Sequence, residues 1–129
     1  MADQIALADT SVLIDYFRKT DKSNSFWVTL YDSGYDFYIS AITEYEIYTG
    51  ATQGQMSFWE NVLEEIKVLP FDQAVVRVAL EINNNLKRKR KQINLADLFI
   101  AATAIANGLP FATLNKKHFE RIDGLDIIK

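Results

Sequence analysis

Three acidic residues that are far apart in the chain each lie within an apolar stretch. Asp9 is in IALADTSVLID, Glu46 in ISAITEYEIYTG and Asp97 in INLADLFIAATAIA. An ionised carboxylate that leaves water must either become neutral or find a cation. If the fold closes these three acids into one pocket, their oxygens suit a hard divalent metal such as Mg²⁺ or Mn²⁺. Water bound to that metal is acidified and becomes a nucleophile for phosphoryl chemistry.

Asp9 and Asp97 each have an alternative role as a helix-capping residue. Asp9 could cap the helix that follows it, which is a common position for aspartate. Asn94 could cap a helix over residues 95–106, with Asp97 at its third position in an arrangement that resembles a capping box. Capping and metal binding are compatible, because the first turn of a helix favours an acid in either case.

Glu46 has a competitor of the same type in Glu44. Residues two apart on a helix point to nearly opposite faces, so only one of them can face the pocket. Ile42 lies one turn before Glu46 and should face the core, which favours Glu46. We expect Asp15 to be exposed or to lie beside the site.

The strands and helices that must position these acids alternate along the chain. The patterns predict strands at residues 5–8, 37–40, 68–69, 111–114 and 125–128, and helices at 11–18, 23–31, 42–50, 57–65, 72–86 and 95–106. We expect Thr10 or Ser11 to cap the first helix. Alternating strands and helices indicate one α/β domain over residues 1–129, a three-layer α/β/α sandwich with a central parallel sheet. Ligands collect at the C-terminal ends of such strands, where all three acids would meet.

Composition excludes several classes of protein. Hydrophobic residues make up 49% and charged residues 24% of the 129 residues, as in a globular protein. The apolar runs are far shorter than the roughly 20 residues that span a bilayer, so we expect no membrane association. The chain has no cysteine, and its N-terminus does not resemble a secretory signal. These features favour the cytoplasm.

The net charge of −3 hides two local groups of cations. Residues 87–91 read KRKRK, and Lys116, Lys117 and Arg121 form a second group. Such groups can hold an RNA or DNA backbone, although cations are also favoured at the solvated C-terminal end of a helix. The candidate RNA-binding residues are Lys87, Arg88, Lys89, Arg90, Lys91 and Lys116.

Four motifs in order along the chain carry a family resemblance. They are DTSVLIDYF, SAITEYEIYTG, NLADLFIAATAIANGLPFATLNKKHF and FERIDGLDII. With these motifs the chain closely resembles the PIN-domain ribonucleases, specifically the VapC-type toxins of toxin–antitoxin pairs. The resemblance implies a PIN-like fold, Mg²⁺-dependent endoribonuclease activity with Mn²⁺ as an alternative, a small cognate antitoxin, and a homodimer.

The resemblance also assigns roles to individual residues. It implies Asp9 and Asp97 as metal ligands and Glu46 as the third catalytic acid. Polar residues that support the first aspartate or lie beside the site match Thr10, Ser11 and Thr113.

One segment departs from the family pattern. Many members carry a fourth acid after the position of Thr113, where this chain reads TLNKKHF. Asn115 and His118 occupy the candidate positions. Asn115 offers an amide oxygen, and His118 could bind metal or phosphate or be a surface or capping residue. The local negative charge is reduced, which favours one firmly held metal ion.

Two other functional classes remain as alternatives. Haloacid-dehalogenase-type phosphatases also begin with an aspartate after the first strand, but they need a second acid two residues later, where this chain has Ser11. A PIN-like module that binds RNA or protein without cleaving RNA is the second alternative. The early aromatic residues could either line a groove for an antitoxin segment or pack in the core: Phe26, Trp27, Tyr31 and Trp59.

Overall fold

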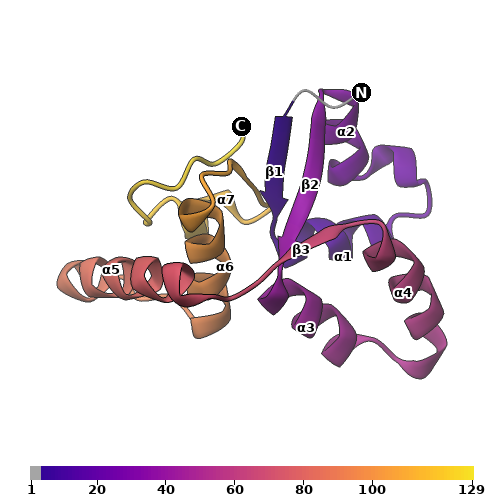
Figure 1. Cartoon of the computed structure of the whole chain (residues 1–129). Coiled ribbons are helices and arrows are strands. Elements are labelled where there is room, and N and C mark those ends of the chain that lie inside the picture. The colour runs from indigo at the N-terminus through magenta and orange to yellow at the C-terminus, as the bar shows by residue number, and fades with distance from the viewer. Residues whose placement is uncertain (1–3) are drawn as a thin grey trace.

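A parallel sheet runs through the middle of the structure, a computed structural model that describes residues 4–129 (Figure 1). Its strand order is β3-β2-β1-β4, and every pairing between neighbouring strands is parallel. The predicted parallel sheet is therefore confirmed. The strands are β1 (Gln4–Ala8), β2 (Tyr35–Ser40), β3 (Lys67–Leu69) and β4 (Phe111–Ala112).

The C-terminal part of the sheet is smaller than the sequence predicts. The strand expected at 111–114 ends at Ala112, because Thr113 turns its hydroxyl toward Asp9. The strand expected at 125–128 is wrong, since this segment makes only one isolated bridge, between Ile127 and Phe111. A partner strand of two residues offers too short an edge for a longer ladder.

The helices agree with the predicted pattern, with corrections at their ends, except for a short helix over residues 116–119 that the sequence does not predict. They are α1 (Thr10–Arg18), α2 (Phe26–Asp32), α3 (Ala41–Gly50), α4 (Met56–Glu64), α5 (Gln73–Lys89), α6 (Leu95–Ala106) and α7 (Lys116–Phe119). The bounds predicted for α6 are confirmed. Asp9 caps α1, so the expected cap at Thr10 or Ser11 is wrong. The helix expected at 23–31 is divided, because the Ser25 side chain caps a new helix by accepting from the Val28 amide.

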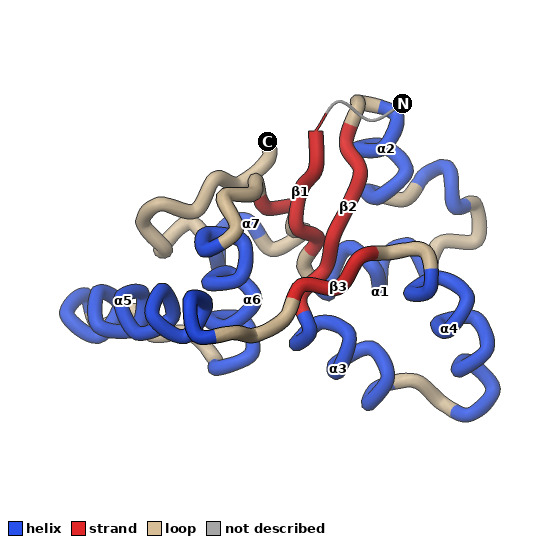
Figure 2. The backbone as a smooth tube through the Cα atoms, viewed as in Figure 1, coloured by secondary structure: helices blue, strands red, loops and turns tan. Residues whose placement is uncertain are grey.

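Side chains that alternate along the strands build a separate core on each face of the sheet. Figure 2 shows helices on both sides of the strands. Leu7 packs with residues of α5 and α6 on one face. Ala6 and Ala8 face the opposite core, which contains residues of α1, α2, α3 and α4. Two helical layers around one sheet confirm the three-layer sandwich. Within residues 4–129, no helix is both long and apolar enough to cross a membrane.

Trp59 belongs to the second of these cores. Its side chain is 2% exposed and stacks on Phe17 with 5.2 Å between ring centroids. Trp27 and Tyr31 instead line a surface groove, whose volume is about 360 Å³. The early aromatic residues therefore divide between the two alternatives. Trp59 lies in the core, Phe26 and Trp27 pack against it while partly buried, and Trp27 and Tyr31 line the groove.

Replacing Trp59 tests this division. We expect Trp59→Ala to lower the free energy of unfolding by about 3–5 kcal/mol, because it removes a large buried side chain and leaves a cavity. Trp27→Ala should lower it by much less, since Trp27 is only partly buried. Urea denaturation monitored by far-UV circular dichroism measures both, and equal losses would contradict the assignment of Trp27 to the surface.

Candidate metal centre

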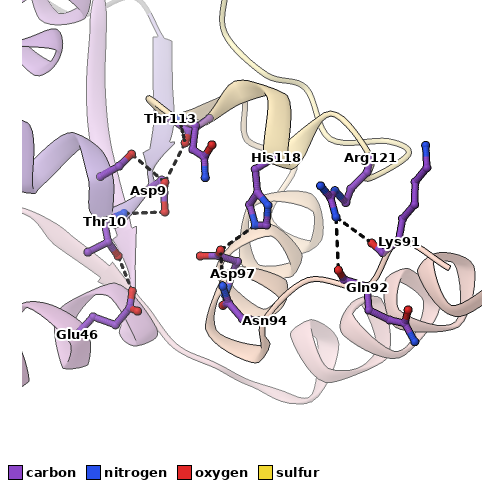
Figure 3. A network of polar contacts seen from close by, with 12 residues as sticks. Asp9, Thr10, Glu46, Lys91, Gln92, Asn94, Asp97, Thr113, His118 and Arg121 are labelled. Atoms are coloured by element: carbon purple, nitrogen blue, oxygen red, sulfur yellow. Dashed lines mark hydrogen bonds and ion pairs between the residues drawn. The ribbon is translucent and has the colours of Figure 1, made fainter. Parts of the chain in front are cut away.

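Asp9 lies at the C-terminal end of β1 and is almost completely buried, with 5% of its surface exposed. Its Oδ1 accepts a hydrogen bond from the backbone N–H of Thr10 at 2.8 Å. Its Oδ2 accepts from the hydroxyls of Ser11, at 2.9 Å, and Thr113, at 2.8 Å. These donors come from α1 and from the residue after β4, so the carboxylate joins two elements that are distant in sequence (Figure 3).

Burial raises the pKa of the Asp9 carboxyl above its ordinary value. The hydrogen bonds from Thr113, Ser11 and Thr10 lower that pKa, whereas the nearby charge of Asp97 raises it. Burial is the largest of these effects, so the ionised form of Asp9 is disfavoured in the folded protein without a cation. A divalent cation beside Asp9 would reverse that balance.

Asp97 lies in the first turn of α6, and within the described part of the chain only one of its two carboxylate oxygens, Oδ2, has hydrogen-bond partners. The Asn94 side chain accepts from the Asp97 N–H at 2.9 Å and donates from Nδ2 to Oδ2 at 2.8 Å. The His118 Nε2 lies 2.9 Å from the same oxygen. The predicted capping by Asn94 is confirmed, and none of residues 4–129 donates a hydrogen bond to Asp97 Oδ1. That oxygen is therefore available to a ligand.

The position of His118 follows from the packing of α7. Phe119, the next residue, is buried and contacts Phe111 of β4 with 4.8 Å between ring centroids. This contact fixes α7 against the sheet beside the start of α6. Figure 3 shows His118 reaching Asp97 from that side, with Asp9 on the other side of Asp97.

Glu46 is linked to Asp9 through Thr10. The Thr10 hydroxyl donates to Glu46 Oε1 at 2.7 Å, while the Thr10 backbone N–H donates to Asp9. Because a hydroxyl has one proton, Thr10 accepts from the buried Thr43 hydroxyl, 3.0 Å away. Glu46 thus lies on the site-facing side of α3, as predicted, and Glu44 makes no hydrogen bond to any described residue.

The three acids do not meet at one point. Among residues 4–129, no three aspartate, glutamate, histidine or cysteine side chains lie close enough together to hold a metal ion. The charge of Asp97 contributes to the raised pKa of Asp9. Glu46 is linked to Asp9 only through Thr10, whose hydroxyl donates to Glu46 and whose backbone N–H donates to Asp9. This arrangement fits Mg²⁺, which usually keeps several waters and takes one or two carboxylates together with substrate phosphates. The residues that would hold it are Asp9 and Asp97.

Several residues near the site differ from expectation or were missed. Asn115 is exposed, and its side-chain amide makes no hydrogen bond to a described residue. Asp15 is partly buried, and its Oδ2 accepts from the backbone N–H of Phe26 at 2.9 Å. The role of Thr43 was missed because threonine after a strand reads simply as a helix start. Its burial, without any exposed surface, is visible only in the fold.

The predicted RNA-binding cations lie in two different places. Lys87, Arg88 and Lys89 form the last turn of α5, and Arg90 ends it in the left-handed conformation. Lys89 pairs with Asp123 at 3.0 Å, and the Lys91 carbonyl accepts from Arg121. Lys91 and Arg121 lie beyond His118 from Asp9 (Figure 3). Lys116, by contrast, lies 5.7 Å from the ring centroid of Phe26 at the start of α2.

Comparison with known proteins identifies the family to which this architecture belongs. A family model described as the PIN domain matches residues 6–125. Ribonuclease VapC1 of Methanocaldococcus jannaschii is 37% identical over 117 residues, which cover 90% of this chain and 79% of the relative. Ribonuclease VapC of Rickettsia bellii is 34% identical, and the match covers 95% of this chain and 93% of the relative. The chain belongs to the PIN-domain family.

Solved structures agree with that assignment. A DNA-bound VapBC structure from Salmonella typhimurium superposes with a TM-score of 0.84 at 26% identity and covers 99% of this chain and 98% of the other. The FitAcB structure from Neisseria gonorrhoeae gives a TM-score of 0.77 at 29% identity, with 96% of each chain covered. Within the family, the chain is a VapC-type ribonuclease, an endoribonuclease. The haloacid-dehalogenase alternative is therefore wrong.

Asp9→Asn tests the electrostatic strain at the site. We expect this variant to be more stable than the wild type at pH 7 in EDTA, because it removes a buried charge and keeps the side-chain shape. Because the pKa of Asp9 is higher in the folded than in the unfolded protein, its ionisation lowers the free energy of unfolding at high pH. This loss of stability disappears as the pH falls and the carboxyl is protonated in both states. The difference should therefore narrow on acidification and vanish below the unfolded-state pKa of about 3.9. Thermal unfolding at several pH values measures it, and a less stable variant at pH 7 would contradict the prediction.

Proposed function

We propose that this VapC-type ribonuclease is the Mg²⁺-dependent toxin of a toxin–antitoxin pair, cleaving RNA with a metal-activated water. The observation that carries this proposal is the buried Asp9 carboxylate, whose ionisation is disfavoured by burial and by the facing Asp97. A buried carboxylate at the C-terminal edge of a parallel sheet supports a cation site there. Mn²⁺ is the alternative metal, since it accepts the same oxygen ligands.

Each acid has a distinct part in this chemistry. A divalent cation at the site would acidify a bound water and neutralise charge on the scissile phosphate. Asp9 is oriented by three donors, so its carboxylate is held rigidly toward the pocket. Asp97 presents Oδ1 while Asn94 and His118 hold Oδ2. Glu46, bound by the Thr10 hydroxyl, is the acid that remains to take a proton from the attacking water.

The partner that we propose is a small cognate antitoxin. The solved relatives include the VapBC pair from Salmonella typhimurium and FitAcB from Neisseria gonorrhoeae. On this chain, the groove with Trp27 and Tyr31 between α2 and α4 has the aromatic lining that an amphipathic segment requires. It lies apart from the acids, so docking there leaves the metal site structurally intact.

Homodimerisation stays a prediction. The surface with suitable chemistry is an open apolar groove of about 310 Å³ between α5 and α6. Leu80 and Leu95, which are 58% and 64% exposed, flank it. Two leucines beside an apolar hollow are the features that a self-complementary interface uses.

Substitution of the two metal ligands tests the chemistry. We expect cleavage of a panel of structured RNAs to require Mg²⁺, to stop in EDTA, and to fall at least about 100-fold in Asp9→Asn and in Asp97→Asn. Asp32→Asn is the matched control, since Asp32 is an exposed acid at the end of α2. Gel electrophoresis of end-labelled RNA measures the rates.

Each other outcome has a clear meaning. Cleavage that survives either substitution would exclude the two-acid metal site. If no RNA is cut but a small cognate antitoxin binds tightly, the chain is instead the PIN-like module that binds RNA or protein without cleaving RNA. The control variant must cleave at the wild-type rate for either conclusion to hold.

His118 is expected to orient Asp97 rather than to bind metal itself. His118→Ala should weaken Mn²⁺ binding about tenfold, the usual effect of losing a group that orients a ligand. His118→Gln should retain most of the affinity, because its amide nitrogen can reach the place of Nε2. Isothermal titration calorimetry measures both variants. Tighter Mn²⁺ binding in His118→Ala would show instead that His118 competes with the metal for Asp97.

A further inference from the structure

A third groove begins beside Asp9 and follows α1 away from it. Its volume is about 520 Å³, and it is open to solvent. Seven residues line it: Thr10, Ser11, Ile14, Asp15, Arg18, Lys19 and Leu114. They come from one face of α1 and from the connection between β4 and α7, so the groove is formed by two separate parts of the chain.

One end of this groove is formed by residues that hydrogen-bond to Asp9. Thr10 and Ser11 line the groove and also donate to the Asp9 carboxylate. The Ser11 hydroxyl oxygen accepts from the backbone N–H of Leu114 at 3.1 Å, which joins the two walls. A chain lying in the groove would therefore contact two of the residues that hold the Asp9 carboxylate.

The charge along the groove is opposite to that of the whole protein, which carries −3. Arg18 forms no ion pair or hydrogen bond with any of residues 4–129. Lys19 lies 3.6 Å from Asp15, an acid that is already bound by the Phe26 amide. Lys116 lies against the ring of that same Phe26 and adds a third cation at this side. Cations thus exceed acids here.

The floor between these cations is apolar. Ile14 is partly buried, and Leu114 is 48% exposed although it directly follows the buried Thr113. Cations that alternate with an apolar surface match a single nucleic-acid strand, which presents phosphates on one side and base faces on the other. An acidic peptide would match the cations but would not need to reach the metal ligands.

We propose that this groove binds the single-stranded RNA segment next to the scissile phosphate, with Arg18 as its main phosphate contact. Ile14 and Leu114 then form the apolar surface against which a base lies. This inference rests on the proposed ribonuclease function and assigns that site its substrate path. It moves the main RNA contact from the KRKRK run, which lies on the other side of Asp97, to α1.

Binding of a fluorescein-labelled oligouridylate of 12 nucleotides in EDTA, followed by fluorescence anisotropy, tests the groove without cleavage. We expect Arg18→Ala to weaken binding about fivefold or more and to reduce the salt dependence by about one phosphate contact. Leu114→Ala should weaken binding with an unchanged salt dependence, because it removes an uncharged contact. Arg77→Ala, which removes one exposed cation of α5, is the matched control and should stay within twofold.

The competing sites give different results. An unchanged affinity in Arg18→Ala, or an equal loss in Arg88→Ala of the KRKRK run, would overturn the proposal. Binding of oligoglutamate that depends on Arg18, without binding of oligouridylate, would assign the groove to an acidic protein segment and also overturn it. Arg18-dependent RNA binding without any Mg²⁺-dependent cleavage would keep the groove and reject the proposed chemistry. Mg²⁺-dependent cleavage together with an unchanged RNA affinity in Arg18→Ala would keep the proposed chemistry and reject the groove.

Discussion

The buried carboxylate of Asp9 is the constraint on which the rest of the site depends. It ends β1, caps α1 and accepts the hydroxyl of Thr113 after β4, so one side chain connects the central strand, a helix and the neighbouring strand. A buried charge needs partners, and every described partner of Asp9 is a neutral donor. The fold therefore holds the carboxylate in place without neutralising its charge, which is why we propose that a cation binds there.

Two buried hydroxyls near Asp9 also have hydrogen-bond partners that hold the site in place. Ser40 and Thr43 have no exposed surface, and their hydroxyls connect to Thr10 and from there to Glu46. These contacts keep Thr10 in one orientation, in which its amide serves Asp9 and its hydroxyl serves Glu46. Polar side chains in a dry core are acceptable when each finds a partner. Here buried hydroxyls also hold Thr10, the residue that binds both Asp9 and Glu46.

The sequence predicts the layers of the fold well because alternating apolar patterns and capping residues follow local rules. Asp97 was recognisable from its place on the apolar α6, and Asn94 from its capping position. What it could not predict are contacts between distant segments. The approach of His118 to Asp97 depends on how Phe119 packs against Phe111, and the reach of Thr10 to Glu46 depends on the angle between α1 and α3. No periodicity encodes either distance.

The structure shows how individual cations are held, which a count of charged residues in the sequence does not show. The KRKRK run is the densest positive segment, yet Lys89 is paired with Asp123 and the Lys91 carbonyl is used by Arg121, so part of the run fastens α5 to the C-terminal segment. Arg18 has one adjacent cation in the sequence, Lys19, and no acidic partner among the described residues. It lines a groove that reaches Thr10 and Ser11, two of the residues that donate to Asp9. Phosphate attraction depends on free cations near the reacting group. This is why we propose Arg18, rather than the cations at the end of α5, as the main contact for the RNA backbone.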